Sequence, residues 1–207
     1  MPTLNLSSEG DVLEIERMYF PVKSLGPGKR FVIWTSGCPR RCENCSNPEL
    51  QERNPLKDIS VKDILKAINT CIKDSDGITI TGGEPFFQPA ELIKLLDGIK
   101  ALGIKDILVY TGYKFEEIER EGGLLKKAAE ICGVIIDGEY IDSLNDNKGI
   151  RGSLNQRIIV IDKSLEEKYS GLDSCPRTSE TIVAKNRIFS AGIPLKILTN
   201  EICSDII

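Results

Sequence analysis

Short apolar runs alternate along the chain with segments in which apolar residues recur every three or four positions. Runs rich in β-branched residues predict buried strands at 31–35, 78–81, 107–110, 134–137 and 158–161. Helical spacing predicts helices over about 61–73, from about 89 to 103, and over about 114–131, with a break at Gly122 and Gly123. Such strand–helix–strand units imply a parallel sheet covered by helices, either an open doubly wound sheet or a partial barrel.

Polar segments follow two of the predicted strands and mark the candidate site. In parallel α/β folds, functional groups gather at the carboxyl ends of the strands. The segment GCPRRCENC (37–45) follows the first predicted strand, and GGEP (82–85) follows the second. We therefore expect these two segments to meet at one edge of the sheet. A long polar loop is predicted at 139–157, before the last strand.

Composition limits the classes of protein that remain. The 207 residues suffice for one domain with a sizeable core, and 41% hydrophobic residues are ordinary for a globular protein. A net charge of −4 without a basic patch gives no reason to expect nucleic-acid binding, and no segment is long and apolar enough to span a membrane. Seven unevenly spaced cysteines favour metal-binding or catalytic thiols in a reducing compartment over a disulfide framework. We therefore expect a cytoplasmic protein.

A cluster of cysteines, Cys38, Cys42 and Cys45, lies in a segment too polar to belong to a hydrophobic core. The isolated cysteines are interpreted as small core residues: Cys71, Cys132, Cys175 and Cys203. A zinc site is an alternative, but the chain has no histidine, so a remote cysteine would have to supply the fourth ligand. An iron–sulfur cubane fits better, because three thiolates can hold three irons and leave the fourth iron open to a substrate.

The turn after the second predicted strand contains the glycine pair Gly82 and Gly83, followed by Glu84. A glycine pair at a strand end indicates a tight turn or a close approach of the backbone to a ligand. Taken alone, such a turn is more often structural. The cysteine segment at the neighbouring strand end favours a ligand site, and backbone groups with a carboxylate suit an ammonium group.

The cysteine motif C-x3-C-x2-C, followed by TGGEPFFQP, resembles the two leading signatures of the radical S-adenosylmethionine enzymes. Further segments resemble the small activating proteins of glycyl radical enzymes, above all those that serve the anaerobic ribonucleoside-triphosphate reductase: GPGKR (26–30), LVYTGY (108–113), IIDGEY (135–140) and RGSLNQR (151–157). The resemblance covers about residues 10–160 in consistent order. It implies a partial (β/α) barrel of the radical S-adenosylmethionine type, with a mainly parallel sheet and outer helices.

The resemblance also implies a cofactor, a reaction and a partner. Cys38, Cys42 and Cys45 would hold one 4Fe-4S cluster, whose open iron binds S-adenosylmethionine. One electron, from a donor such as flavodoxin or ferredoxin, would cleave this cofactor to methionine and a 5′-deoxyadenosyl radical, which takes hydrogen from a glycine of a partner glycyl radical enzyme. No catalytic residue beyond the cluster-bound cofactor is implied, because radical chemistry belongs to the cofactor. The cofactor-binding residues implied are Gly82, Gly83, Glu84, Thr111, Asn155 and Arg157.

Two features depart from the family pattern. Asn44 precedes the third cysteine, where many of these activators have glycine. The chain also outruns the compact activators, so we expect a radical S-adenosylmethionine core at 1–163 and a C-terminal extension at 164–207 that packs on the core or completes it.

Two other functions stay open. One is a radical enzyme that modifies a small molecule or a peptide. The other is a non-catalytic iron–sulfur or zinc protein, which would leave the turn at 82–85 without a purpose.

Overall fold

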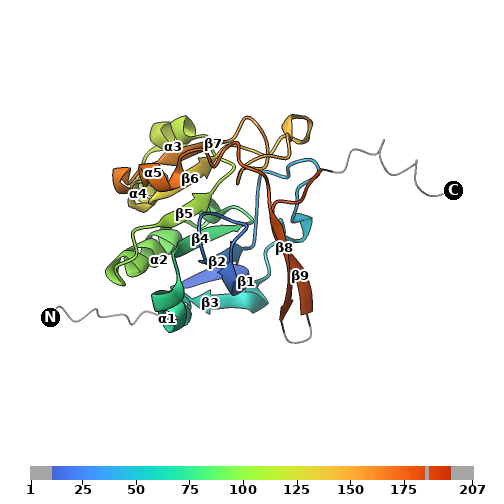
Figure 1. Cartoon of the computed structure of the whole chain (residues 1–207). Helices are drawn as coiled ribbons and strands as arrows, with labels where there is room; N and C mark the ends of the chain where they lie inside the picture. Colours follow the sequence, from blue (N-terminus) through green and yellow to red (C-terminus); the bar gives the residue numbers. More distant parts are fainter. Residues whose placement is uncertain (1–10, 185–186, 197–207) are drawn as a thin grey trace.

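A seven-stranded mixed sheet forms the centre of the computed structural model, which describes residues 11–184 and 187–196. The strand order is β3-β1-β2-β4-β5-β6-β7, and a separate hairpin pairs β8 with β9 (Figure 1). The pairs β2–β4, β4–β5 and β5–β6 are parallel, whereas the pairs toward both edges are antiparallel. The strands are β1 (Val12–Val22), β2 (Arg30–Thr35), β3 (Asp58–Ser60), β4 (Gly77–Gly82), β5 (Ile107–Tyr110), β6 (Val134–Asp137), β7 (Arg157–Val160), β8 (Ser179–Ala184) and β9 (Arg187–Gly192).

The five strands predicted from the sequence are present as β2, β4, β5, β6 and β7. The prediction of a mixed α/β fold with a mainly parallel central sheet is therefore confirmed. The last of these strands, β7, runs antiparallel to β6, with Arg157 opposite Asp137. The longest strand, β1, was not predicted. Its sequence, VLEIERMYFPV, mixes charged and apolar residues and most of it is only partly buried, so no continuous apolar run marks it.

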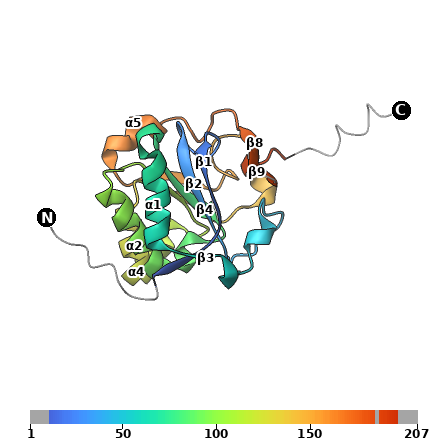
Figure 2. The same ribbon diagram turned by 90° about the horizontal axis from the view of Figure 1, so that it is seen from below.

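Helices connect the parallel strands and cover one face of the sheet. In Figure 1, α1, α2 and α4 lie to the left of the sheet and the β8–β9 hairpin lies to its right; Figure 2 shows the same helices from below. Within the described residues, no helix has the length and apolar character needed to cross a membrane. The α-helices are α1 (Val61–Cys71), α2 (Pro89–Ala101), α3 (Phe115–Glu121), α4 (Gly123–Ile131) and α5 (Glu166–Tyr169). The 3-10 helices are η1 (Pro48–Leu50), η2 (Pro55–Lys57), η3 (Ile72–Asp74), η4 (Pro85–Phe87), η5 (Asp142–Leu144) and η6 (Lys163–Leu165).

Local sequence signals explain where the helices begin and end. The Ser60 hydroxyl accepts a hydrogen bond from the Asp63 amide and caps α1. Pro89 occupies the first turn of α2, where its missing N–H costs nothing. Gly122, at φ +64°, separates α3 from α4, so the predicted break is confirmed.

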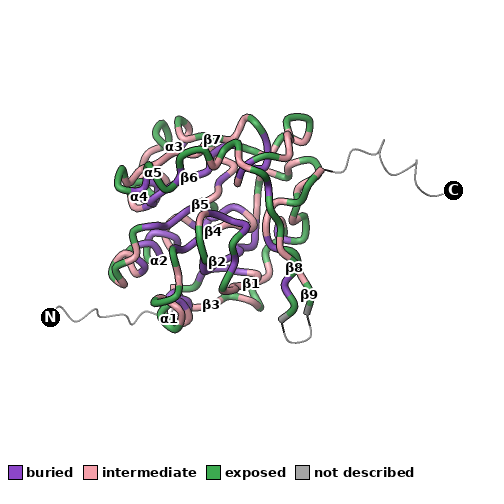
Figure 3. The backbone as a smooth tube through the Cα atoms, viewed as in Figure 1, coloured by how far each residue is buried: buried purple, intermediate pink, exposed green. Residues whose placement is uncertain are grey.

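Apolar side chains at alternate strand positions fill both faces of the sheet. On β2, Ile33 points into the core beneath the helices, while Val32 and Trp34 pack toward Ile182 and Ala191 of the β8–β9 hairpin. The central strands are accordingly buried along most of their length (Figure 3). Each fully buried aliphatic side chain contributes about 1.5–3 kcal/mol through removal from water.

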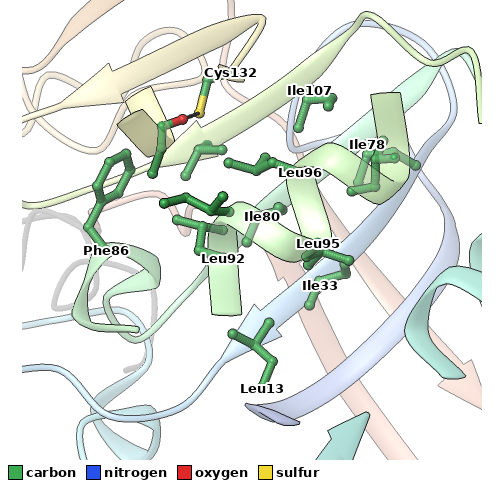
Figure 4. Close-up of a cluster of buried hydrophobic side chains, with 14 of the residues drawn as sticks. Leu13, Ile33, Ile78, Ile80, Phe86, Leu92, Leu95, Leu96, Ile107 and Cys132 are labelled. Atoms are coloured by element: carbon green, nitrogen blue, oxygen red, sulfur yellow. Dashed lines mark hydrogen bonds between the residues drawn. The ribbon is translucent and has the colours of Figure 1, made fainter. Parts of the chain in front are cut away.

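Of the isolated cysteines, Cys132 belongs to the buried core and Cys71 packs against it, as expected, whereas Cys175 joins no core cluster. Cys132 is fully buried, and its thiol donates to the Ala128 carbonyl at 3.3 Å (Figure 4). Burial raises the pKa of the Cys132 thiol to about 12, so this side chain remains protonated. Cys71 and Cys175 are partly buried. Cys203 lies outside the described residues.

Helix α5 and the β8–β9 hairpin pack against the sheet face opposite α1 and α2. Tyr169 of α5 joins a cluster with Leu108 and Val134, and Phe189 of β9 meets Tyr19 and Trp34 edge-on, with ring centroids 5.7 and 6.0 Å apart. These aromatic contacts attach the C-terminal region to β1 and β2. The division of the chain into a core at 1–163 and an extension at 164–207 stays a prediction.

A buried ionic network closes the amino end of the parallel strands, at the edge opposite the cysteines. The guanidinium of Arg30, from the GPGKR segment, is fully buried and donates to both carboxylate oxygens of Asp106, at 2.9 and 3.1 Å. The Tyr169 hydroxyl and the Lys168 ammonium also donate to this carboxylate, each at 2.6 Å. GPGKR therefore stabilises the fold at this edge.

Asp106→Asn is expected to lower the free energy of unfolding by about 3 kcal/mol at pH 7, because it leaves the buried Arg30 without its charged acceptor. Burial alone would raise the pKa of Asp106, but hydrogen bonds from Arg30, Lys168 and Tyr169 bring it below its usual value. Since the folded-state pKa lies below the unfolded value of about 4, the carboxylate stabilises the fold above that pH and loses this effect as the pH falls through the folded-state pKa.

Denaturant unfolding of the wild type and Asp106→Asn over a range of pH measures this difference. The two proteins should converge as the pH falls toward about 2. A difference that stays constant over the whole range would show that the charge of Asp106 does not stabilise the fold.

Candidate active site

Backbone hydrogen bonds tie the cysteine segment, which begins where β2 ends, to the glycine turn at the end of β4. The Gly83 amide donates to the Thr35 carbonyl at 2.8 Å, and the Glu84 amide donates to the Gly37 carbonyl at 2.9 Å. Cys38 directly follows Gly37, so the first cysteine is fixed beside the turn. The expectation that the two segments meet at the carboxyl edge of the sheet is confirmed.

Both glycines of the turn are required by this close approach of two backbone segments. Gly82 has φ +108°, and a Cβ atom there would lie 2.5 Å from the backbone nitrogen and oxygen of Thr35. A Cβ atom on Gly83 would lie 2.4 Å from the Gly37 carbonyl oxygen and 2.9 Å from that of Leu50. At Gly83, the close approach inferred from the sequence is therefore made to the cysteine segment.

The Glu84 carboxylate joins the end of β4 to the end of β5. Its Oε1 accepts from the Phe86 amide at 3.0 Å and from the Thr111 hydroxyl at 2.8 Å, and its Oε2 accepts from the Gly112 amide at 2.7 Å. Burial raises the pKa of Glu84, while these hydrogen bonds favour the charged form. Glu84 and Thr111 thus fix each other and the two strand ends.

The three clustered cysteines are half-buried and line one cavity of about 120 Å³, which we call the cysteine cavity. Burial raises the pKa of the Cys38 and Cys42 thiols, so binding of a metal cluster there has to displace protons. Among the described residues, no three His, Cys, Asp or Glu side chains are arranged to hold a single metal ion. The cavity is lined by Cys38, Arg40, Cys42, Cys45, Asn47, Gln51, Thr81, Gly82, Gly83, Glu84, Tyr110, Thr111, Gly112, Gly138, Tyr140 and Gln156.

Asn44 has a backbone conformation that explains its identity. Its φ is +52°, in the left-handed region that glycine adopts freely and asparagine tolerates best among other residues. Asparagine therefore suits position 44, because it adopts this backbone conformation at little cost.

Arg40 links the cysteine segment to the far side of the site. Its guanidinium donates to Glu139 at 2.9 Å, approaches Glu117 of α3 at 3.4 Å, and lies 4.2 Å from the centre of the Tyr113 ring. Acidic residues of two other segments therefore converge on Arg40.

A second cavity of about 140 Å³ adjoins the cysteine cavity, and the two share Cys45, Asn47, Thr81, Gly82, Tyr110, Tyr140 and Gln156. The Cys45 thiol and amide, hydroxyl, aromatic and aliphatic side chains surround it, and none of these lining residues is a lysine, arginine, aspartate or glutamate. The lining residues are Leu25, Trp34, Asn44, Cys45, Ser46, Asn47, Thr81, Gly82, Tyr110, Tyr140, Asn145, Gly152, Gln156, Gly192, Ile193 and Pro194.

Two residues predicted to bind the cofactor do not line either cavity. Arg157 donates to Glu116 at 2.8 Å and to Asp137 at 2.5 Å, and its guanidinium lowers the pKa of Glu116 to about 2. The Asn155 amide donates to the Glu139 carbonyl at 2.8 Å. Contact of Asn155 and Arg157 with a cofactor stays a prediction.

Gln156, between those two residues, lines both cavities, although it is not among the six cofactor-binding residues named from the sequence. Its Oε1 accepts from the Gly152 amide at 2.7 Å, and its Nε2 donates to the Gly138 carbonyl at 2.7 Å. Gln156 directly precedes β7, whose first residue is Arg157, and side chains alternate between the two sides of a strand, so the side chains at 156 and 157 point to opposite sides. That alternation was the available signal.

Comparison with known proteins agrees with this geometry. A family model described as a 4Fe-4S single cluster domain matches residues 24–159. The anaerobic ribonucleoside-triphosphate reductase-activating protein of Enterobacteria phage T4 is 35% identical over 64% of this chain and 85% of its own length. The protein of the same name from Escherichia coli K12 is 32% identical over 67% of this chain and 93% of its own length. The pyruvate formate-lyase-activating enzyme of Clostridium pasteurianum is 30% identical over 56% of this chain and 48% of its own length.

A three-thiolate site at the carboxyl edge of a parallel sheet and a 4Fe-4S domain model together define an iron–sulfur protein. The chain belongs to the family of radical S-adenosylmethionine enzymes that activate glycyl radical enzymes. Its cofactors are accordingly a 4Fe-4S cluster and S-adenosylmethionine.

Gln156→Ala is expected to weaken S-adenosylmethionine binding about tenfold, because it removes a side chain shared by both cavities and frees the Gly152 amide. Arg157→Ala, whose side chain faces Glu116, should change the affinity less than about twofold. Equilibrium binding of S-adenosylmethionine to both reconstituted variants measures this. A larger loss in Arg157→Ala than in Gln156→Ala would show that the cofactor contacts the other side of this segment.

Proposed function

We propose that this chain activates an anaerobic ribonucleoside-triphosphate reductase by generating a radical on one of its glycines. The observation that carries the proposal is that Cys38, Cys42 and Cys45 line the same cavity as the glycine turn. Cysteine thiolates are the usual ligands of a 4Fe-4S cluster, and three of them leave one iron open. A ligand bound in this cavity would therefore contact both the open iron and the turn.

The chain's own residues would bind and orient the cofactor. Cys38, Cys42 and Cys45 would hold the cluster, which supplies the electron that cleaves S-adenosylmethionine. Gly82 and Gly83 would face the methionyl amino group with their backbone. The Glu84 carboxylate already accepts three hydrogen bonds, so we assign it, together with Thr111, to holding the turn in place.

The size of the relatives favours the reductase as partner. The chain covers 85% and 93% of two reductase-activating proteins but 48% of a pyruvate formate-lyase-activating enzyme. We propose reduced flavodoxin or ferredoxin as the electron donor and the cytoplasm as the compartment, since reduced clusters and free thiols need a reducing environment. We also propose that the sheet and its outer helices form a partial barrel whose carboxyl edge receives the partner.

The second cavity distinguishes this function from radical modification of a small metabolite. A phosphorylated or carboxylated substrate would find no cationic side chain among the residues that line it. A glycine-bearing peptide segment has an uncharged main chain, whose amides can pair with the asparagine and glutamine side chains of the wall. The uncharged lining therefore favours a peptide segment of a partner enzyme.

Anaerobic mixing of the reconstituted, reduced protein with S-adenosylmethionine and purified reductase tests the proposal. The expected result is the electron-spin resonance doublet of a glycyl radical on the reductase, absent when S-adenosylmethionine is omitted. Cofactor cleavage without such a doublet on either the reductase or pyruvate formate-lyase would contradict activation and favour modification of a small molecule or another peptide.

A further inference from the structure

Residues beyond the family-matched region complete the wall of the second cavity. The family model ends at 159, yet Gly192, Ile193 and Pro194 line this cavity beside Asn145 and Gly152. The cavity is therefore enclosed by two segments, the loop at 145–152 and the chain at 192–194, that face the end of β4.

Arg177 lies behind this wall and bonds to both segments. Its side chain is only 1% exposed. One terminal nitrogen donates to the Asn145 side chain at 2.8 Å and to the Pro194 carbonyl at 3.3 Å. The other donates to the carbonyls of Lys148, Arg151 and Gly152, at 3.1, 2.7 and 3.2 Å. A single buried cation thus fixes three residues of the cavity wall without lining the cavity itself.

Further tethers connect the same two regions. The Gly149 amide donates to the Cys175 carbonyl at 2.7 Å, and the Asn147 side chain exchanges two hydrogen bonds with the Lys196 backbone, at 2.6 and 3.0 Å. On the other side, the Tyr110 hydroxyl donates to the Ile150 carbonyl at 2.7 Å. The loop is therefore held between β5 and the C-terminal segment.

We propose that residues 175–177 and 192–196 act as a clamp that sets the width of the second cavity, with Arg177 as its positioning residue. The inference rests on the proposed function and assigns the clamp a task within it. A fixed, narrow wall admits an extended glycine-bearing segment and keeps other hydrogen donors away from the 5′-deoxyadenosyl radical. When the wall loosens, the radical takes a hydrogen atom from another C–H or S–H bond, so 5′-deoxyadenosine still forms while the partner's glycine keeps its hydrogen.

Arg177→Met tests the clamp, with Arg30→Met as the matched control. Arg30 is an equally buried arginine with carbonyl and carboxylate acceptors, but it lies at the opposite edge of the sheet. Amide hydrogen exchange at 149–154 should accelerate about tenfold or more in Arg177→Met and stay within about twofold of the wild type in Arg30→Met. This measurement needs neither the cluster nor the partner.

The second measurement is the ratio of 5′-deoxyadenosine released to glycyl radical formed on the reductase. It should rise several-fold in Arg177→Met at unchanged iron content, fall back toward the wild-type ratio in Arg177→Lys, and stay unchanged in Arg30→Met. If Arg177→Met fails to fold, Asn147→Ala, which removes the Lys196 tether, takes its place. Unchanged exchange at 149–154, or faster exchange with an unchanged ratio, overturns the clamp. If the wild type forms no glycyl radical, the proposed function fails, and the exchange data still decide whether Arg177 holds the wall.

Discussion

Replacing any one of Cys38, Cys42 and Cys45 by alanine is expected to abolish cluster assembly and reduce glycyl radical formation to background. The three thiols lie around one cavity, and among the described residues no carboxylate or further thiol lines it except Glu84, whose oxygens are already bonded. No neighbouring group can therefore replace a missing ligand. Iron and sulfide should fall from about four of each per reconstituted chain to roughly one or fewer.

Cys71→Ala and Cys132→Ala are the matched controls, because both thiols donate to helix carbonyls beneath the sheet. Cys132→Ala should cost about 1 kcal/mol of stability through the small cavity it leaves, with cluster content unchanged. Cluster loss in either control would mean that the ligand set is not the three clustered cysteines. One equivalent of zinc without iron absorption in the wild type would favour the zinc alternative.

Gly83→Val is expected to lower glycyl radical yield about a hundredfold, because it pushes the cysteine segment away from the turn. A side chain at 83 would meet the carbonyl oxygens of Gly37 and Leu50, which are backbone atoms that cannot rotate aside. Displacement of a reacting group by about 1 Å can cost two orders of magnitude in rate. Both S-adenosylmethionine affinity and iron content should fall, and the overpacked turn should cost about 2 kcal/mol of stability.

Gly103→Ala separates this effect from general loss of a glycine. Gly103 has φ +86°, but a Cβ atom there would meet nothing within 4 Å among the described residues. It should therefore cost about 1 kcal/mol of backbone strain and leave the cluster and the radical yield unchanged. A Gly83→Val protein with normal iron content and cofactor affinity would show that the two segments do not depend on each other.

The central strands and the cysteine segment could be predicted from the sequence, because local composition alone marks both. The β-branched runs of β2, β4, β5 and β6 are buried on both faces, so their composition alone marks them. Because β2 and β4 are parallel, the segments that follow them lie at the same edge of the sheet. The sequence alone therefore predicts that the cysteine segment and the glycine turn lie close together. The close spacing of Cys38, Cys42 and Cys45 in a polar segment was sufficient to predict them as metal ligands.

Other features depend on contacts between segments far apart in the sequence. Glu84 reads as a ligand for an ammonium group, yet in the fold its oxygens face Phe86, Thr111 and Gly112. Arg177 lies in a second CPR sequence at 175–177, and no local pattern there predicts that it binds the cavity wall. That role depends on hydrogen-bond acceptors up to 32 residues away in the sequence. No continuous apolar run marks the strand β1, because its charged residues Glu14, Glu16 and Arg17 pair with Arg53, Lys57 and Glu49 of the segment between β2 and β3.

Transfer of deuterium from the reductase to 5′-deoxyadenosine would show most directly that the chain generates a radical on a glycine of the reductase. The anaerobic reductase, prepared with α-deuterated glycine, is mixed with the reduced protein and S-adenosylmethionine, and the 5′-deoxyadenosine formed is analysed by mass spectrometry. We expect one deuterium atom in each 5′-deoxyadenosine, and the amount of labelled product should increase together with the glycyl radical signal. Unlabelled 5′-deoxyadenosine in this experiment, and labelled 5′-deoxyadenosine when the deuterium is placed instead on an added small molecule or an unrelated peptide, would contradict this expectation.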